Sequence, residues 1–135
     1  MNQSIVERFL DAVQQKDLDG LSALLDAQVS LVQPLTFNGS AIPEVQFDGE
    51  DAVLSYLQQV FTHMAQVRFT NPTISVANDN NTVFFEAIGD FVTATSAPYK
   101  NVYLFKFELR DSKIFHIAEY ANPVTYAITF GVKLG

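Results

Sequence analysis

The sequence contains no cysteine and no tryptophan, and only eight lysine and arginine residues stand against fifteen aspartate and glutamate residues. The absence of cysteine excludes disulfides, thiolate metal ligands and a cysteine nucleophile. It fits a reducing compartment, and we expect a cytoplasmic protein. The formal net charge of −7 and the lack of any basic run argue against binding to nucleic acid or to an anionic membrane surface.

Long apolar runs are also missing. No segment approaches the ~20 residues that span a membrane, and acidic residues interrupt the amphipathic N-terminus, which therefore does not resemble a signal peptide. The chain is instead rich in phenylalanine, with twelve residues, and 48% of all residues are hydrophobic. We therefore expect a single domain over residues 1–135, with a core large enough to enclose an apolar cavity.

Helical periodicity is confined to the first half of the chain. Apolar residues recur at helical spacing over residues 5–13, over residues 18–25 after the candidate cap Asp17, and over residues 53–64 after acids that suit a first helical turn. Residues 29–35 alternate as a strand, and residues 36–49 are typical of a long loop. Such a loop is uncommon in a compact domain unless it covers something. Whether it closes over a pocket is left open.

From residue 66 onward the apolar period changes to two. Strands are expected over residues 67–76, with a bulge or bend at Asn71-Pro72, over residues 82–95 and 99–109, and again after a tight turn over residues 110–113. Helices followed by antiparallel strands predict an α+β fold. The strand over residues 83–95 is apolar on both faces, so both need cover. Helices supply one cover, and we expect a homodimer, packed sheet to sheet, to supply the other.

The last of these strands carries a carboxylate among apolar residues. By alternation, Glu119 shares its side with Phe115, Ile117 and Ala121. Burying an unpaired carboxylate costs several kcal/mol. Two explanations are open. Either Glu119 faces an apolar pocket, where its pKa rises toward the range useful for general acid work, or it is held for structure, by an ion pair with Arg68 or Arg110 or by hydrogen bonds alone.

The order of these elements, together with the ending S-K-I-x-x-x-x-E-Y-x-N-P over residues 112–123, resembles the SnoaL-like branch of the nuclear transport factor 2-like superfamily. That superfamily includes ketosteroid isomerases, scytalone dehydratase, polyketide cyclases and phenazine-biosynthesis proteins. The resemblance covers nearly the whole chain. It implies a cystatin-like cone: a curved, mostly antiparallel sheet wrapped around three helices from the N-terminal half, enclosing an apolar pocket, usually in a dimer. It implies no single reaction, because the fold hosts many.

Most residues that the likeness to ketosteroid isomerases would require are absent. That family has a general-base aspartate before a proline at the end of the first strand, where this chain has Gln33 before Pro34. It has an oxyanion-hole tyrosine in the first helix, where this chain has Phe9. Glutamine cannot abstract a carbon-bound proton and phenylalanine cannot donate a hydrogen bond. The family's neutral aspartate donor corresponds in place to Tyr103, which remains a candidate donor.

The end of the chain is more similar to the phenazine-type members, in the residues Glu119-Tyr120, Asn122-Pro123 and Phe130-Gly131. In those proteins the glutamate of the final strand projects into the cavity and acts as an acid or base on an aromatic or polycyclic substrate. The resemblance therefore implies an acid/base role for Glu119.

Four polar residues are expected on inward faces of the sheet. Tyr99, Asn101 and Tyr103 alternate on the core side of one strand, and Gln33 does so on another. Polar groups in such places need partners. Each is therefore either a ligand contact or bonded within the protein, and together they favour a pocket with polar spots.

Three further residues are candidate ligand contacts. Tyr56 lies on the apolar face of the third helix and Phe9 on that of the first. His63, seven residues after Tyr56, lies either at the cavity mouth or at the rim, as a cation near the C-terminus of its helix.

The combined interpretation is a protein that binds a small apolar or aromatic molecule. As an enzyme it would be a cofactor-independent isomerase, cyclase or dehydratase, with Glu119 moving a proton and Tyr103 and Asn101 polarising a carbonyl or hydroxyl. The alternative is a non-catalytic ligand carrier or a dimeric interaction module. The spacing of histidines and carboxylates predicts no metal site, and the absence of a phosphate loop and of a dinucleotide-binding glycine pattern predicts no cofactor.

Overall fold

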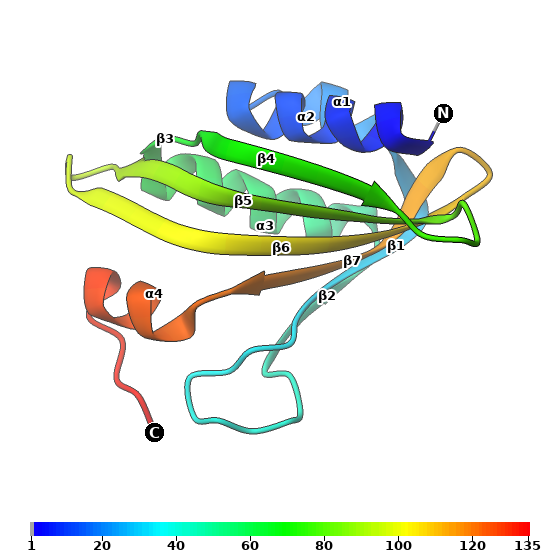
Figure 1. The fold of residues 1–135 in the computed structure, drawn as a ribbon. Helices are drawn as coiled ribbons and strands as arrows, with labels where there is room; N and C mark the ends of the chain where they lie inside the picture. Colours follow the sequence, from blue (N-terminus) through cyan, green and yellow to red (C-terminus); the bar gives the residue numbers. More distant parts are fainter. Residues whose placement is uncertain (1) are drawn as a thin grey trace.

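A computed structural model describes residues 2–135 as one curved sheet with helices packed along it (Figure 1). The helices are α1 (Asn2–Gln15), α2 (Leu18–Ser22), α3 (Glu50–His63) and α4 (Pro123–Phe130). The strands are β1 (Leu25–Gln33), β2 (Val45–Asp48), β3 (Met64–Gln66), β4 (Phe69–Val76), β5 (Thr82–Thr93), β6 (Pro98–Arg110) and β7 (Lys113–Ala121). No helix within residues 2–135 is long and apolar enough to cross a membrane.

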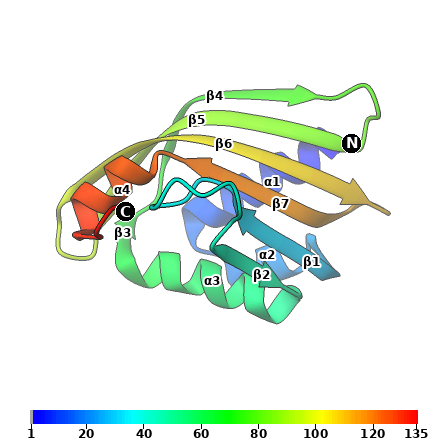
Figure 2. The same cartoon turned by 90° about the horizontal axis from the view of Figure 1, so that it is seen from below.

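The sheet has seven strands in the order β2-β1-β7-β6-β5-β3, with β4 also paired to β5 (Figure 2). The β1–β7 pair is parallel and the other pairs are antiparallel. Helices α1, α2 and α3 all come from the first half of the chain and lie along one side of this sheet. The predicted α+β fold, a curved and mostly antiparallel sheet around three helices, is confirmed.

The core lies between these helices and the inward face of the central strands. Alternate residues of β6 from Tyr99 to Leu109 are buried, as the period of two predicts. Phe85 of β5 and Phe107 of β6 are almost fully buried, and Phe9 of α1 packs edge-on against Phe107 with the ring centroids 5.3 Å apart. The abundant phenylalanines thus hold α1 against the sheet by burial of apolar area.

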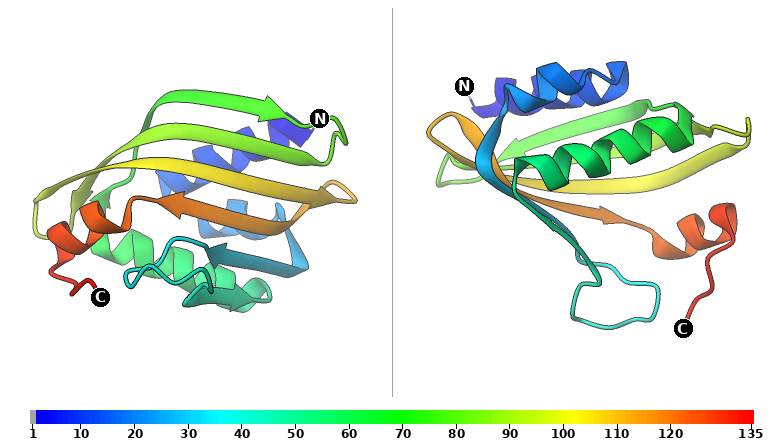
Figure 3. Two further views of the ribbon diagram at one scale, coloured as in Figure 1. Left: turned by 60° about the horizontal axis from the view of Figure 1, so that its bottom comes forward. Right: turned by 180° about the vertical axis from the view of Figure 1, so that it is seen from behind.

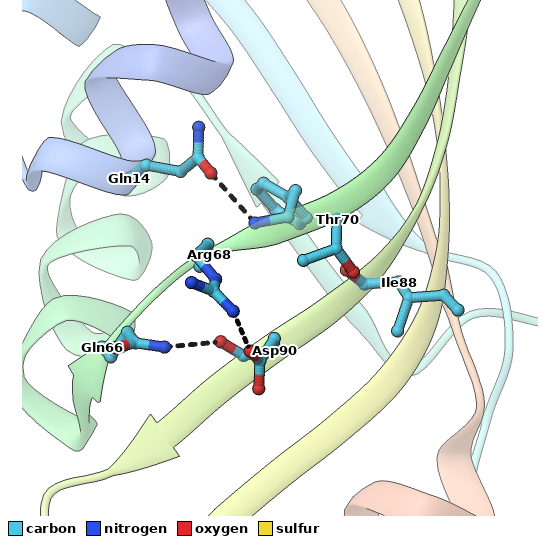
Figure 4. A network of polar contacts seen from close by, with 7 residues as sticks. Gln14, Gln66, Arg68, Thr70, Ile88 and Asp90 are labelled. Atoms are coloured by element: carbon cyan, nitrogen blue, oxygen red, sulfur yellow. Dashed lines mark hydrogen bonds and ion pairs between the residues drawn. The ribbon is translucent and has the colours of Figure 1, made fainter.

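Polar contacts fix α1 and β3 to the edge of the sheet (Figure 4). The side-chain oxygen of Gln14, in the last turn of α1, accepts a hydrogen bond of 2.9 Å from the backbone N–H of Phe69. Nearby, Arg68 forms an ion pair with Asp90 of β5, and Gln66 of β3 donates to the carbonyl of Asp90 at 3.1 Å. These contacts set the position of α1 over the inner face.

The boundaries predicted between residues 18 and 49 were partly wrong. Asp17 caps α2 as expected, but the helix ends at Ser22, and Leu25 already belongs to β1. The segment predicted as a loop over residues 36–49 contains the short strand β2, which pairs with β1. Strand β2 is fixed by a long-range contact, because Phe47 stacks on Tyr56 of α3 at 4.7 Å. Only residues 34–44 form an irregular segment.

Helix α4 was not predicted, although the sequence contains its end signals. Asn122 caps it by accepting a hydrogen bond of 3.0 Å from the backbone N–H of Val124, and Pro123 occupies the first turn, where no N–H is needed. Gly131 ends it in the left-handed conformation, with φ +70°. The pairs Asn122-Pro123 and Phe130-Gly131, which carried the family resemblance, are therefore the two ends of a helix.

The alternation predicted along β7 was wrong at its start. The register shifts where Glu108 and Leu109 face β7, which leaves Phe115 unpaired as a bulge. Ile114, which a strict alternation would place on the side opposite Glu119, is fully buried, and so is Ile117. Phe115 instead lies beneath the guanidinium of Arg110, 4.9 Å from its ring centroid. Because the bulge precedes Ile117, the inward direction predicted for Glu119 is unaffected.

Candidate ligand-binding site

A cavity of about 400 Å³ opens between the inner face of the sheet, α3 and α4. The 34–44 segment and α4 lie on the same side of the sheet (Figure 3), and both contribute lining residues to this cavity. The ring of Phe37 lies 5.6 Å from that of Tyr126, and the carbonyl of Phe37 accepts from the backbone N–H of Gly135. Among the lining residues none is lysine or arginine and seven are aromatic: Phe37, Tyr56, Phe91, Tyr99, Tyr103, Tyr126 and Phe130.

Glu119 of β7 contributes the carboxylate of this cavity, and two donors hold it. The hydroxyl of Tyr56, from α3, donates to Oε1 at 2.6 Å, and Nε2 of Gln33, from the end of β1, donates to the same oxygen at 3.1 Å. Gln33 Nε2 also lies 2.8 Å from the Tyr56 hydroxyl, which closes a triangle. Within residues 2–135 no protein group donates to Oε2, so the second oxygen is left for a ligand in the cavity.

The arginines considered as partners of Glu119 pair elsewhere. Arg68 pairs with Asp90, and Arg110 approaches Asp26 at 3.5 Å. The ion-pair explanation for Glu119 is therefore wrong. The cavity is lined by neither lysine nor arginine, so apart from His63 at its exposed edge no basic side chain of the described wall balances an ionised carboxylate there.

Burial raises the pKa of Glu119, and the hydrogen bonds from Tyr56 and Gln33 oppose this without cancelling it. A carboxyl group with a raised pKa gains and loses its proton closer to neutral pH than a solvated one does, which is what acid/base catalysis requires. The pKa of the Tyr56 hydroxyl is also held well above its ordinary value, mainly by burial and next by the charge of Glu119. Tyr56 therefore remains a hydrogen-bond donor.

Three more tyrosines surround the carboxylate. Burial is the main cause that raises the pKa of Tyr99, Tyr103 and Tyr126, and the charge of Glu119 adds to the rise in each case. The Tyr99 hydroxyl accepts a hydrogen bond of 2.7 Å from Nδ2 of Asn101. Because their raised pKa values keep the hydroxyls of Tyr99 and Tyr103 protonated, each has a proton to donate to a ligand oxygen in the cavity.

Asn101 has no hydrogen-bonding group left for a ligand. Its Nδ2 donates to the Tyr99 hydroxyl at 2.7 Å and to the carbonyl of Asn122 at 3.1 Å. Its Oδ1 accepts from the backbone N–H groups of Val102 and Asn122. These four bonds use the full capacity of the amide. Asn101 thus positions Tyr99 and ties β6 to the start of α4.

The two remaining candidate ligand contacts are His63 and Phe9, which lie at opposite ends of the site. His63, at the end of α3, is exposed at the edge of the cavity, and its Nδ1 lies 2.8 Å from the carbonyl oxygen of Gln59. Phe9 does not line the large cavity. It lines a smaller one of about 40 Å³ behind Glu119.

Several aromatic lining residues were missed in the sequence. Phe91 has the inward parity of β5 and was identifiable from alternation. Tyr126 and Phe130 come from α4, which was not predicted. No group of three or more histidines and carboxylates within residues 2–135 is placed to hold a metal ion.

Comparison with known proteins assigns the fold to a family. The profile of the family described as SnoaL-like domain matches residues 6–117. The chain belongs to this SnoaL-like family. The resemblance to the SnoaL-like branch of the nuclear transport factor 2-like superfamily is thereby confirmed.

Three relatives of this SnoaL-like chain are informative. It is 28% identical to the uncharacterized protein YesE of Bacillus subtilis (strain 168) over 127 residues, which are 93% of this chain and 84% of YesE. It matches the structure of an isomerase candidate from Bacillus subtilis with a TM-score of 0.84, at 25% identity over 98% and 94% of the two chains. It shares its fold with a phenazine biosynthesis-related protein from Pseudomonas aeruginosa, with a TM-score of 0.80, at 20% identity over 99% and 83%.

Proposed function

We propose that this SnoaL-like domain binds a small aromatic or otherwise apolar molecule and moves a proton on it without a cofactor. One observation carries the proposal. Within residues 2–135 no protein group donates a hydrogen bond to Oε2 of Glu119, and Glu119 lines an aromatic cavity whose described wall contains no lysine or arginine. A partly buried carboxylate at an apolar cavity is stabilised by a proton or by a ligand that donates one.

The arrangement suits proton abstraction next to a carbonyl. Oε2 of Glu119 takes a proton from the carbon beside the carbonyl, and the electrons of that C–H bond form the C=C bond of an enolate. The negative charge develops on the carbonyl oxygen, where the hydroxyl of Tyr103 stabilises it as a hydrogen-bond donor. Return of the proton from Glu119 to the same or another carbon restores the carboxylate. Tyr56 and Gln33 hold the carboxylate throughout.

The relatives support this class of reaction. One structural neighbour is described as an isomerase candidate and another as related to phenazine biosynthesis. Both descriptions belong to those proteins, and they fit small-molecule chemistry on the shared fold. The cytoplasmic location expected from the sequence is part of the same proposal.

Exchange of carbon-bound hydrogen tests the proposal. The protein is mixed with propiophenone in D₂O, and loss of the signal of the hydrogens beside the carbonyl is followed by ¹H NMR. Glu119→Gln should lower the exchange rate by about 10²–10⁴-fold, which is the usual contribution of a general base. Glu86→Gln, on an exposed residue of β5, is the matched control and should leave the rate unchanged.

Two results would contradict the proposal. Saturable binding of the ketone with no exchange above background would favour the non-catalytic carrier. Exchange that survives Glu119→Gln would assign the proton transfer to another group.

We also infer a homodimer through the outer face of the sheet. Apolar side chains remain on that face, with Val102 59% and Ile88 42% exposed in the single chain. Phe84 and Leu104 lie partly buried on the same face. Covering them by a second copy would bury these four apolar side chains.

A further inference from the structure

A second, smaller cavity lies behind the carboxylate. Its volume is about 40 Å³, and five of its lining residues also line the large cavity: Tyr56, Val60, Phe91, Tyr103 and Glu119. The two cavities therefore meet at the wall that carries the proton-transfer groups. We call them the outer and the inner cavity.

The inner cavity is suited to hydrocarbon. The nine residues that line it alone are all apolar, among them Val13 of α1, Leu57 of α3 and Ile117 of β7. Its polar groups are those of the shared wall, and Tyr56 and Oε1 of Glu119 are already bonded to each other. A water molecule needs two to four polar partners, whereas apolar cavities of this kind stay dry and accept apolar groups. The space exceeds the ~10–15 Å³ that one small probe requires.

The position of the inner cavity restricts what the ligand can be. The reacting carbon must lie at Glu119, in the shared wall, and an aromatic ring fits only the larger, aromatic outer cavity. The inner cavity, on the other side of the shared wall, is the space available for whatever else is attached to the reacting carbon. That part must be apolar and short.

We propose that the substrate is an aryl alkyl ketone, or a molecule with the same three parts in the same order. The aromatic ring occupies the outer cavity, the carbonyl and its neighbouring carbon lie between Tyr103 and Glu119, and a short alkyl arm enters the inner cavity. This assignment rests on the proposed function and adds the substrate class. It also makes Leu57 and Val13 specificity-determining residues, because they set the depth of the inner cavity without lining the outer one.

The length of the alkyl arm provides the test. Dissociation constants of acetophenone, propiophenone, butyrophenone and octanophenone are measured by NMR titration of the intact protein. Affinity should rise roughly fourfold with each methylene that fits the inner cavity, and then fall for the octanoyl arm. Leu57→Ala enlarges the inner cavity and should move the optimum to a longer arm.

Two further variants complete the design. Val13→Leu fills the inner cavity and should move the optimum to acetophenone, and it carries the test if Leu57→Ala does not fold. Leu54→Ala is the matched control, because Leu54 is on the same helix and packs against the core but lines neither cavity. Its optimum should equal that of the unchanged protein.

The outcomes separate this inference from the proposed function. Affinity that is independent of arm length, or an optimum that neither Leu57→Ala nor Val13→Leu moves, would overturn the inference while Glu119-dependent exchange still supported the function. If none of the ketones binds, both the substrate class and the proposed function are overturned.

Discussion

At the scale of single residues, the site is arranged around one carboxylate with two neutral donors. Gln33 stands where the resemblance to ketosteroid isomerases would place an aspartate, yet its amide donates to Glu119 at 3.1 Å. A second carboxylate at that distance would repel the first and raise its pKa further. The cavity therefore has one carboxylate in its described wall, Glu119 of β7, and Gln33 donates a hydrogen bond to it.

Glu119 should make stability depend on pH. Its pKa is raised in the folded protein, so the folded state binds this proton more tightly than the unfolded state does. Its contribution is therefore most favourable below the ordinary pKa of ~4.3 and declines as the pH rises through the folded-state value. Glu119→Gln removes this dependence. In urea denaturation from pH 4 to pH 8, the stability of the variant relative to the unchanged protein should increase with pH. A constant difference would contradict a desolvated Glu119.

At the scale of the elements, the backbone of β5 makes room for a functional side chain. A Cβ atom on Gly89 would lie 2.4 Å from Cε2 of Tyr103 and 3.1 Å from a ring atom of Phe91. Both rings line the cavity. Glycine is therefore required at position 89 for close approach of the Tyr103 ring across the strand.

Gly89→Ala should displace the Tyr103 ring and move its hydroxyl within the cavity. Overpacking of this kind destabilises a protein by about 1–3 kcal/mol, and ketone binding should weaken as well. Urea denaturation and NMR titration with propiophenone measure the two effects. Unchanged binding would show that the position of Tyr103 does not matter to the ligand.

The elements also show what local sequence patterns can reveal. Periodicity found α1, α3 and the long strands, because each buries one face against a single core. It missed α4, whose residues are apolar on most sides and whose best evidence was its end signals. It missed β2, which is four residues long and is held by the contact between Phe47 and Tyr56.

The site was only partly predictable for a related reason. The direction of Glu119 follows from alternation within β7 and was correct. The triangle of Gln33, Tyr56 and Glu119 joins β1, α3 and β7, whose registers and packing are set by the whole fold. Asn101 could not be assigned from sequence either, because its partner Asn122 lies 21 positions away at the start of α4.

At the scale of the whole molecule, the inner face of the sheet contributes to the cavity and the outer face is free for association. The central strands β5 and β6 contribute to both faces, so a partner covering the outer face would also support the strands that position Tyr99, Tyr103 and Phe91. Dimerisation and the site are thus expected to share these two strands.

Val102→Arg tests the proposed interface, because it places a charge at the most exposed valine of the outer face. The variant should sediment as a monomer, whereas the unchanged chain should sediment as a dimer. Val124→Arg, at a valine of α4 that is 47% exposed, is the matched control and should remain dimeric. Dissociation by the control alone would place the interface at α4 instead of the sheet.

An NMR titration of the Glu119 carboxyl carbon, with and without propiophenone, tests most directly whether Glu119 is a desolvated acid/base group with one oxygen open to a ligand. We expect a pKa above the ordinary ~4.3 of glutamate, which shifts again when the ketone occupies the cavity. A pKa at the ordinary value that no ketone changes would contradict an acid/base role for Glu119.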